Sequence, residues 1–254
     1  MENLINVDYS EAFNVTTITL NRPEKRNALS SQMIQQLHQA IDQLHNNPHT
    51  KLVIIKGAGE AFCAGGDLSE FHGDLTQPEA LAMLEPMKSV LWKLTTLSVP
   101  TVAWMNGLAR GGGMELASAC DFRFVQSGSN YGFTQGQLGI STGWGGGTLL
   151  YERIHNQDAY YWLVKADVRE ADQLIAIRFA QGVFSYNDYI WESGLITPFL
   201  NRDIEQLIHW KQQWLQQFDL QMLKTRMDDE VESCSYLWVS EAHHQAVAQF
   251  FNRK

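Results

Sequence analysis

Short strand-like runs alternate with helical patterns along the first half of this chain. The strand-like runs are rich in β-branched or aromatic residues and occupy Val15–Leu20, Leu52–Ile55, Thr101–Met105 and Phe122–Val125. Between them, apolar residues recur at intervals of three and four after Ser30 and again around Pro78–Ser98, which is the spacing of one helical face. Strands that alternate with helices predict an α/β fold.

Glycine is concentrated in the middle of the chain, where 17 of the 19 glycines lie between Gly57 and Gly147. A glycine lets other atoms approach its backbone amide closely and adopts a positive φ without strain. This distribution predicts that backbone groups of the middle segment bind a ligand or take part in chemistry.

The composition changes after about Pro198, where glycine disappears and Gln, Trp and charged residues dominate. Apolar residues still recur at helical spacing in this part of the chain. We therefore predict two or three helices over Ile204–Phe251, which act either as a lid or as an oligomerisation element.

The charge balance excludes some classes of partner. The chain carries 28 acidic and 19 basic residues, which gives a formal net charge of −9. Proteins that coat nucleic acid or adhere to membrane surfaces rely on massed Lys and Arg, so we expect neither partner. An anionic ligand would need a local cluster of cations.

The cysteines give no framework for a disulfide or a metal. Cys63, Cys120 and Cys234 are odd in number and widely spaced, and no His-Glu-x-x-His occurs, so we expect neither a disulfide scaffold nor a metal centre. No apolar run approaches the roughly 20 residues of a membrane helix. The first residues do not resemble a targeting segment. We expect a cytoplasmic protein.

Two segments carry the strongest chemical signal. Ala61–Leu68 and Asn106–Leu116 each follow an apolar strand, pass through glycines and continue into a predicted helix. The start of a helix presents unpaired backbone N–H groups and the positive end of the helix dipole. Two such junctions that face each other predict an oxyanion hole, whose donors stabilise negative charge in a transition state.

A third segment offers a competing interpretation. Gly139-Ile140-Ser141-Thr142-Gly143 fits the Gly-x-Ser-x-Gly pattern of serine hydrolases, with Ser141 as the nucleophile. That pattern requires a buried strand immediately before it, and Thr134–Leu138 is a poor strand candidate.

Four segments together resemble a known family. Asn21–Leu29, Ala61–Leu68, Gly111–Leu116 and Ala246–Phe251, in this order and at these separations, resemble the enoyl-CoA hydratase/isomerase (crotonase) superfamily. The resemblance implies a spiral of ββα units over residues 1–195, followed by a helical trimerisation segment over residues 196–254. It also implies a homotrimer or a dimer of trimers.

The resemblance implies an acyl-coenzyme A thioester as substrate and an enolate-like intermediate. Backbone amides of Gly66 and Gly112 would hold the thioester oxygen, and coenzyme A would enter as part of the substrate, with no further cofactor. Residues implied to contact coenzyme A or the acyl group are Lys25, Arg26, Ala28, Ala64, Asp67, Leu68, Gln135, Trp144 and Arg253. Lys25 and Arg26 would supply the local cations for the coenzyme A phosphates.

Two positions decide which reaction this family pattern supports. Glu115 matches the first of two glutamates that hydratases use, and we expect it to transfer a proton. The second glutamate is replaced by Gln135, which cannot exchange a proton as a carboxylate does. Glu60, Asp67 or another acid could replace the missing glutamate, although an Asp at position 67 is more often structural.

An oxyanion hole with one carboxylate resembles the decarboxylases of this superfamily, which act on malonyl-type thioesters. Ordinary hydration therefore becomes doubtful, and decarboxylation is the main alternative. The segments Cys120–Arg123 and Gly143–Gly146 also resemble that branch. A non-catalytic acyl-CoA-binding relative is the remaining alternative, because Gln135 could mark lost chemistry.

Overall fold

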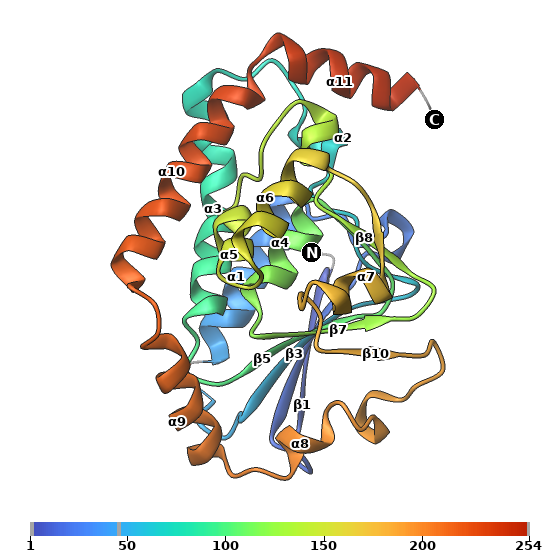
Figure 1. Cartoon of the computed structure of the whole chain (residues 1–254), viewed down its shortest axis with the longest axis vertical. Helices are drawn as coiled ribbons and strands as arrows, with labels where there is room; N and C mark the ends of the chain where they lie inside the picture. The colour runs from blue at the N-terminus through green and yellow to red at the C-terminus, as the bar shows by residue number, and fades with distance from the viewer. Residues whose placement is uncertain (1–2, 45–46, 253–254) are drawn as a thin grey trace.

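The computed structural model describes residues 3–44 and 47–252, and its described part contains two β-sheets wrapped by helices (Figure 1). The larger sheet has the order β1-β2-β3-β5-β7-β10 and the smaller one β4-β6-β8-β9. The strands of the larger sheet are β1 (Ile5–Ser10), β2 (Val15–Leu20), β3 (Leu52–Gly57), β5 (Thr101–Met105), β7 (Phe122–Gln126) and β10 (Gly182–Phe184). Those of the smaller sheet are β4 (Ala61–Cys63), β6 (Leu108–Arg110), β8 (Asn130–Gly132) and β9 (Arg169–Glu170).

From β3 to β8, consecutive strands alternate between the two sheets. β3, β5 and β7 pair in parallel in the larger sheet, while β4, β6 and β8, which follow them in the chain, pair in parallel in the smaller one. Each pair of strands is followed by helix, so the chain advances as a spiral of ββα units. The α/β class and the strands β2, β3, β5 and β7 were predicted correctly. The six-residue β1 was missed. The short strands β4, β6, β8, β9 and β10 were also missed, because two or three residues carry too little periodicity to be recognised.

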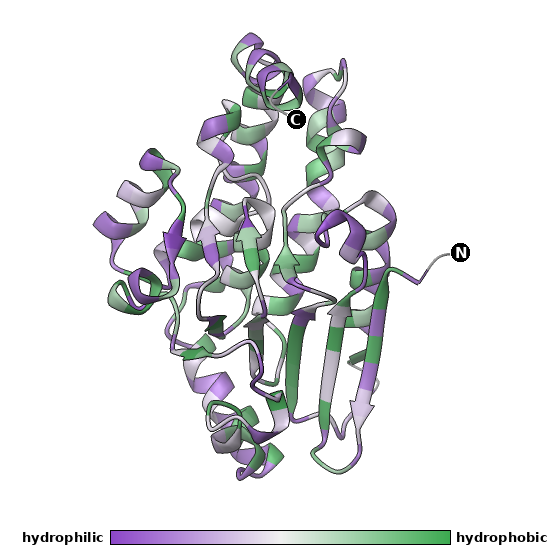
Figure 2. Cartoon of the chain, turned by 90° about the vertical axis from the view of Figure 1, so that its right-hand side faces the viewer, coloured by the Kyte–Doolittle hydropathy of each residue, from purple (hydrophilic) through white to green (hydrophobic). Residues whose placement is uncertain are grey.

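The larger sheet is buried on both faces. Val53 and Ile55 of β3 belong to the main hydrophobic core, while the alternate residues Leu52 and Ile54 belong to a second cluster on the opposite face. This alternation follows from the two-residue period of a strand. Figure 2 shows apolar residues along the strands of this sheet. The sheet is therefore a rigid frame for the turns that leave its strands.

Helices cover the sheets and begin where the sequence predicts. α1 (Ser31–Leu44) and α3 (Gln77–Thr95) match the two periodic patterns. The Ser30 hydroxyl accepts the Met33 N–H at 3.2 Å, which satisfies one of the free donors at the start of α1. The other elements before the carboxyl-terminal segment are η1 (Pro23–Lys25), α2 (Leu68–Phe71), α4 (Gly112–Ala119), η2 (Gln135–Leu138), α5 (Gly146–Tyr151), α6 (Asn156–Lys165), α7 (Ala171–Ala176) and η3 (Ile190–Glu192).

The carboxyl-terminal segment is helical. After the short α8 (Thr197–Leu200), three helices follow, which confirms the expectation of two or three: α9 (Ile204–Leu215), α10 (Leu220–Trp238) and α11 (Glu241–Asn252). α10 runs alongside α3 (Figure 1). The role of this carboxyl-terminal segment in trimer assembly stays a prediction. Among the helices of the described ranges, none is both long and apolar enough to cross a bilayer.

One buried ion pair fastens α9 to the larger sheet. The Lys211 Nζ donates to both carboxylate oxygens of Asp121 at 2.6 and 2.7 Å and to the Thr95 carbonyl at 3.0 Å. Asp121 also accepts the Thr101 N–H at 2.9 Å. The side chains of Lys211 and Asp121 are only 1% and 5% exposed. Burial lowers the pKa of Lys211, and the Asp121 charge opposes that shift.

We expect Lys211→Met to destabilise the fold by about 3–5 kcal/mol, because it leaves the Asp121 carboxylate buried without its cation. Urea unfolding of the variant measures the loss. Lys224→Met is the matched control, since Lys224 forms an exposed pair with Asp228 whose removal should cost about 0.5 kcal/mol or less. Equal midpoints for the two variants would contradict a stabilising role for the buried pair.

Candidate active site

The Gly66 amide is left free by the way its turn pairs with the chain. The Leu29 N–H donates to the Gly65 carbonyl at 2.8 Å, and the Asp67 N–H donates to the Leu29 carbonyl at 2.9 Å. In a trans peptide the C=O and N–H point in opposite directions, so the Gly66 N–H points away from Leu29. It donates to no described residue. The helix expected after this turn is the four-residue α2, so strand-like pairing, rather than a long helix, orients this amide.

The Gly112 amide is free because it begins a helix. The Gly111 carbonyl accepts the N–H groups of Met114 and Glu115 at 2.9 and 3.1 Å, so the Gly112 N–H of the same peptide points outward from the start of α4. It also donates to no described residue. The two turns touch, since a Cβ atom on Gly65 would lie 3.3 Å from the Gly112 nitrogen. Both glycines line one pocket, as the predicted oxyanion hole requires.

The pocket in front of these amides is small and largely apolar. A Cβ atom on Gly112 would overlap the indole ring of Trp144, and one on Gly66 would lie 3.2 Å from the Phe71 ring. The cavity measures about 90 Å³, well below the roughly 300–1,000 Å³ of a typical drug-sized ligand site. The space next to the two amides therefore fits a small group.

Glu115 lies in the first turn of α4, at the wall of this pocket, and is only 2% exposed. Its Oε2 accepts the backbone N–H groups of Trp144 at 2.9 Å and Gly146 at 3.0 Å. Its Oε1 accepts the Gln135 amide at 2.8 Å and, at a longer 3.4 Å, the Gly143 N–H. The carboxylate is thus held in one position by the loop that precedes α5.

Opposing effects set the pKa of Glu115. Burial raises it most, and the charge of Glu230 on α10 raises it further, while the Trp144 and Gly146 amides and the Gln135 side chain lower it. The balance raises the pKa of Glu115 from 4.5 to about 7. A carboxyl group with this pKa exchanges protons near neutral pH, as a general acid or base must.

Gln135 is a buried neighbour of Glu115. It begins η2, is 8% exposed and donates to Glu115. Among the described residues that line the pocket, Glu115 is the one carboxylate. Glu60 is exposed and does not line the pocket. Asp67 binds Arg22 at 2.6 Å and accepts the Ser69 N–H as the cap of α2. Neither candidate acid replaces the missing glutamate.

The remaining predicted residues lie at the pocket wall, in the neighbouring loop, or outside the described residues. Ala64 and Leu68 line the pocket. Lys25 and Arg26 are exposed, and the Arg26 carbonyl accepts the Ala64 N–H at 2.9 Å, which places the backbone of their loop beside the pocket wall. Ala28 lies in the same loop, where its carbonyl accepts the Arg22 guanidinium. Arg253 lies outside the described residues.

α10 contributes residues that the sequence analysis missed. Cys234 and Trp238 line the pocket, and Glu230 accepts the N–H groups of Gly145, Gly147 and Thr148 at the start of α5. The signal was present as an apolar helical stripe over Leu223, Met227, Val231, Cys234 and Trp238. Nothing in that stripe indicates which part of the chain it covers.

Burial raises the pKa of Cys234 and of Cys63 to about 12, so neither thiol is an activated nucleophile.

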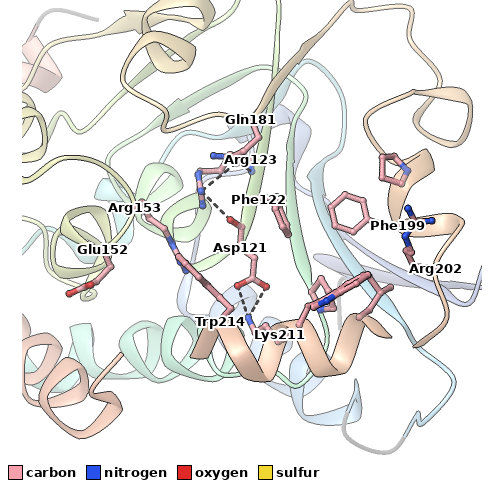
Figure 3. Close-up of a pocket in the computed structure, with 14 residues that line it drawn as sticks. Asp121, Phe122, Arg123, Glu152, Arg153, Gln181, Phe199, Arg202, Lys211 and Trp214 are labelled. Atoms are coloured by element: carbon pink, nitrogen blue, oxygen red, sulfur yellow. Dashed lines mark hydrogen bonds and ion pairs between the residues drawn. The ribbon is translucent and has the colours of Figure 1, made fainter. Parts of the chain in front are cut away.

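A larger cavity of about 480 Å³ lies between α9 and the end of β7 (Figure 3). Two of its charged side chains are held by protein groups: Lys211 by Asp121, and Arg123 by the carbonyls of Phe179, Cys120 and Asp121. Arg153 donates through Nε to the Ser118 carbonyl at 3.0 Å, whereas its Nη1 is buried and has no hydrogen-bond partner among the described residues. The described residues that line this cavity include no pair of free amides like that of Gly66 and Gly112. This cavity lies apart from the predicted chemistry.

Ser141 is not arranged as a hydrolase nucleophile. Its hydroxyl donates to the Thr142 carbonyl at 3.0 Å, and no described histidine is hydrogen-bonded to it. The segment before it forms η2 rather than the strand that the Gly-x-Ser-x-Gly elbow needs.

Comparisons with known proteins bear on the family of this chain. The family model described as enoyl-CoA hydratase/isomerase matches residues 10–177. The chain is 31% identical over 229 residues to the ethylmalonyl-CoA decarboxylase of Bos taurus, covering 89% of this chain and 69% of the relative. It is 32% identical over 171 residues to that of Gallus gallus, covering 67% of this chain and 57% of the relative. The latter match thus spans little more than half of the relative's length.

A solved structure supports the fold. An enoyl-CoA hydratase from Mycobacterium avium superposes with a TM-score of 0.85 at 21% identity, covering 100% of this chain and 98% of that one. At this identity the likeness concerns the fold alone. Together with the family match over residues 10–177, these findings show that the chain belongs to the enoyl-CoA hydratase/isomerase family.

Proposed function

We propose that this protein decarboxylates a short malonyl-type acyl-CoA, that is, a thioester with a carboxylate on carbon 2. One observation carries the proposal: Glu115 is the one carboxylate among the described residues that line the pocket, and Gln135 is hydrogen-bonded to it where hydration would use a second acid. The relatives named ethylmalonyl-CoA decarboxylase support the same reaction.

The geometry supplies what this reaction needs. The thioester oxygen accepts the free N–H groups of Gly66 and Gly112, which are directed at the charge that develops there. The bond between carbon 2 and the carboxylate breaks, and carbon dioxide leaves. The electron pair of the broken bond stays with the thioester and forms the enolate. Neutral Glu115 then donates its proton to carbon 2 and regains one from solvent. One proton is consumed per turnover, so one acid is sufficient.

Substrate recognition follows from the same residues. The small cavity beside Trp144 favours short acyl groups. Lys25 and Arg26 provide exposed cations near Ala64 for the phosphates of coenzyme A. In this proposal coenzyme A arrives with the substrate and no other cofactor is used. We also propose that the active protein is a homotrimer or dimer of trimers in the cytoplasm.

Product analysis tests the reaction directly. Purified protein is incubated separately with ethylmalonyl-CoA, methylmalonyl-CoA, crotonyl-CoA and a 3-enoyl-CoA, and the products are identified by mass. We expect loss of carbon dioxide from a malonyl-type thioester. Gain of water on crotonyl-CoA, or a shifted double bond, would assign hydration or isomerisation instead. Binding without any product would favour a non-catalytic relative.

Glu115→Gln should lower kcat by about 100-fold to 10,000-fold, the usual contribution of a general acid. KM should change by no more than about threefold, because the amide keeps an oxygen for the backbone donors. Steady-state kinetics with the substrate identified by the product analysis measure kcat and KM. Glu232→Gln makes the same chemical change on an exposed face of α10 and should leave both constants unchanged. Near-normal kcat for Glu115→Gln would exclude it as the proton donor.

The pH profile should report the Glu115 proton. Because the neutral form is the donor and its pKa is raised to about 7, kcat/KM should be level below about pH 7 and fall about tenfold per pH unit above it. Glu230→Gln removes a charge that raises this pKa, so the falling limb should move to lower pH. A profile that rises with pH would mean that Glu115 acts as a base.

A further inference from the structure

The side-chain amide of Gln135 is buried with one end unpaired. Its Nε2 donates to Glu115 Oε1 at 2.8 Å, whereas its Oε1 is buried and accepts no hydrogen bond from any described residue. Gln135 lines the pocket and is 8% exposed. Leaving a buried acceptor unpaired costs free energy, so we expect this atom to find its partner in what the pocket binds.

The charges around Gln135 are unsuited to a bound carboxylate in this arrangement. Among the described residues that line the pocket there is no lysine, arginine or histidine. A carboxylate bound there would face the negative Glu115 and the carbonyl oxygen of Gln135. Besides the Gly66 and Gly112 amides, the pocket wall presents the indole of Trp238, whose Nε1 is also buried without a partner among the described residues.

The two ends of a glutamine amide have the same shape but opposite hydrogen-bonding roles. When Glu115 is ionised, only the N–H₂ end can face it. When Glu115 is protonated, its hydroxyl can donate to the Gln135 carbonyl oxygen, and the N–H₂ end becomes free. The proton belongs on Glu115 Oε1, because Oε2 accepts two backbone N–H groups at 2.9 and 3.0 Å.

We propose that Gln135 is the residue that makes the pocket specific for acidic thioesters: its amide turns over when Glu115 takes up a proton and then donates N–H₂ to the substrate carboxylate. This inference rests on the proposed function. It couples two events that decarboxylation needs together, since the neutral Glu115 that can protonate the enolate is also the state in which the carboxylate binds.

The titratable groups around Glu115 and Gln135 leave the Glu115 proton in control of this hydrogen-bonded pair. The titratable groups facing it are Glu230 and Cys234 on α10, which both lie near Glu115, and His243 on α11, whose Nδ1 contacts the Leu138 carbonyl at the end of η2. Burial raises the pKa of Cys234 to about 12, and burial lowers the pKa of His243. Both are therefore neutral where Glu115 titrates.

The test compares two thioesters that differ by one carboxylate, ethylmalonyl-CoA and butyryl-CoA. Binding is measured by calorimetry in the Glu115→Gln background, where turnover is suppressed and the new amide can donate permanently to Gln135. We expect ethylmalonyl-CoA to bind this variant with the same Kd from about pH 6 to about pH 8. In the unsubstituted protein, KM for ethylmalonyl-CoA should rise across the same range as Glu115 ionises.

Gln135→Met, added to that background, removes the amide but keeps its length. We expect Kd for ethylmalonyl-CoA to rise by about tenfold or more, as for loss of a hydrogen bond to a charged group, with Kd for butyryl-CoA within about twofold. Gln245→Met is the matched control, because Gln245 makes the same amide-to-carboxylate bond at the surface, to Glu241 at 2.8 Å. It should change neither value.

Other outcomes overturn the proposal. Equal losses for both thioesters would mean that Gln135 has only a structural role. Unchanged binding in Gln135→Met, with a loss in Trp238→Phe, would assign the carboxylate to the indole instead. Gln135→Glu guards against misfolding of the first variant: it should retain butyryl-CoA binding and lose ethylmalonyl-CoA binding. Absence of carbon dioxide release by the unsubstituted protein would reject the proposed function. Product analysis measures that release independently of these Kd values, so the two failures are distinguishable.

Discussion

Two turns of backbone pack directly against each other, and the candidate active site depends on this close approach. A Cβ atom on Gly113 would collide with the Cys63 carbonyl, and one on Gly65 would lie 3.0 Å from the Arg110 carbonyl. Any side chain there would force the turns apart. With glycine, β4 and β6 remain paired, and the free amides of Gly66 and Gly112 share one small cavity.

The chemistry then depends on a buried carboxyl group that is stabilised by amides and opposed by a neighbouring charge. Backbone donors alone would keep Glu115 ionised, and burial alone would keep it neutral. The Glu230 charge adds to the effect of burial, and the result is a pKa of about 7. Glu230 also caps α5, so the same residue supports the loop that holds Glu115 and tunes its proton affinity.

The carboxyl-terminal helices are part of the site rather than an appendage. α10 lies along α3 and contributes Cys234 and Trp238 to the pocket wall, while Lys211 fastens α9 to the end of β7 through Asp121. A division near residue 196 describes where the composition changes. It does not divide the pocket, because both parts of the chain line it.

The sequence alone was enough to predict the α/β class, the strands β2, β3, β5 and β7, the carboxyl-terminal helices and the family, because hydrophobic periodicity and glycine spacing are local properties. It also singled out Glu115 and Gln135 as the two positions on which the proposed reaction depends. It did not reveal β1, nor the short strands β4 and β6, whose pairing partners are far away in the chain. Only the tertiary structure decided that Gln135 touches Glu115, that Asp67 is committed to Arg22, and that Glu230 raises the Glu115 pKa. These outcomes depend on distances between segments widely separated in sequence, which no local pattern encodes.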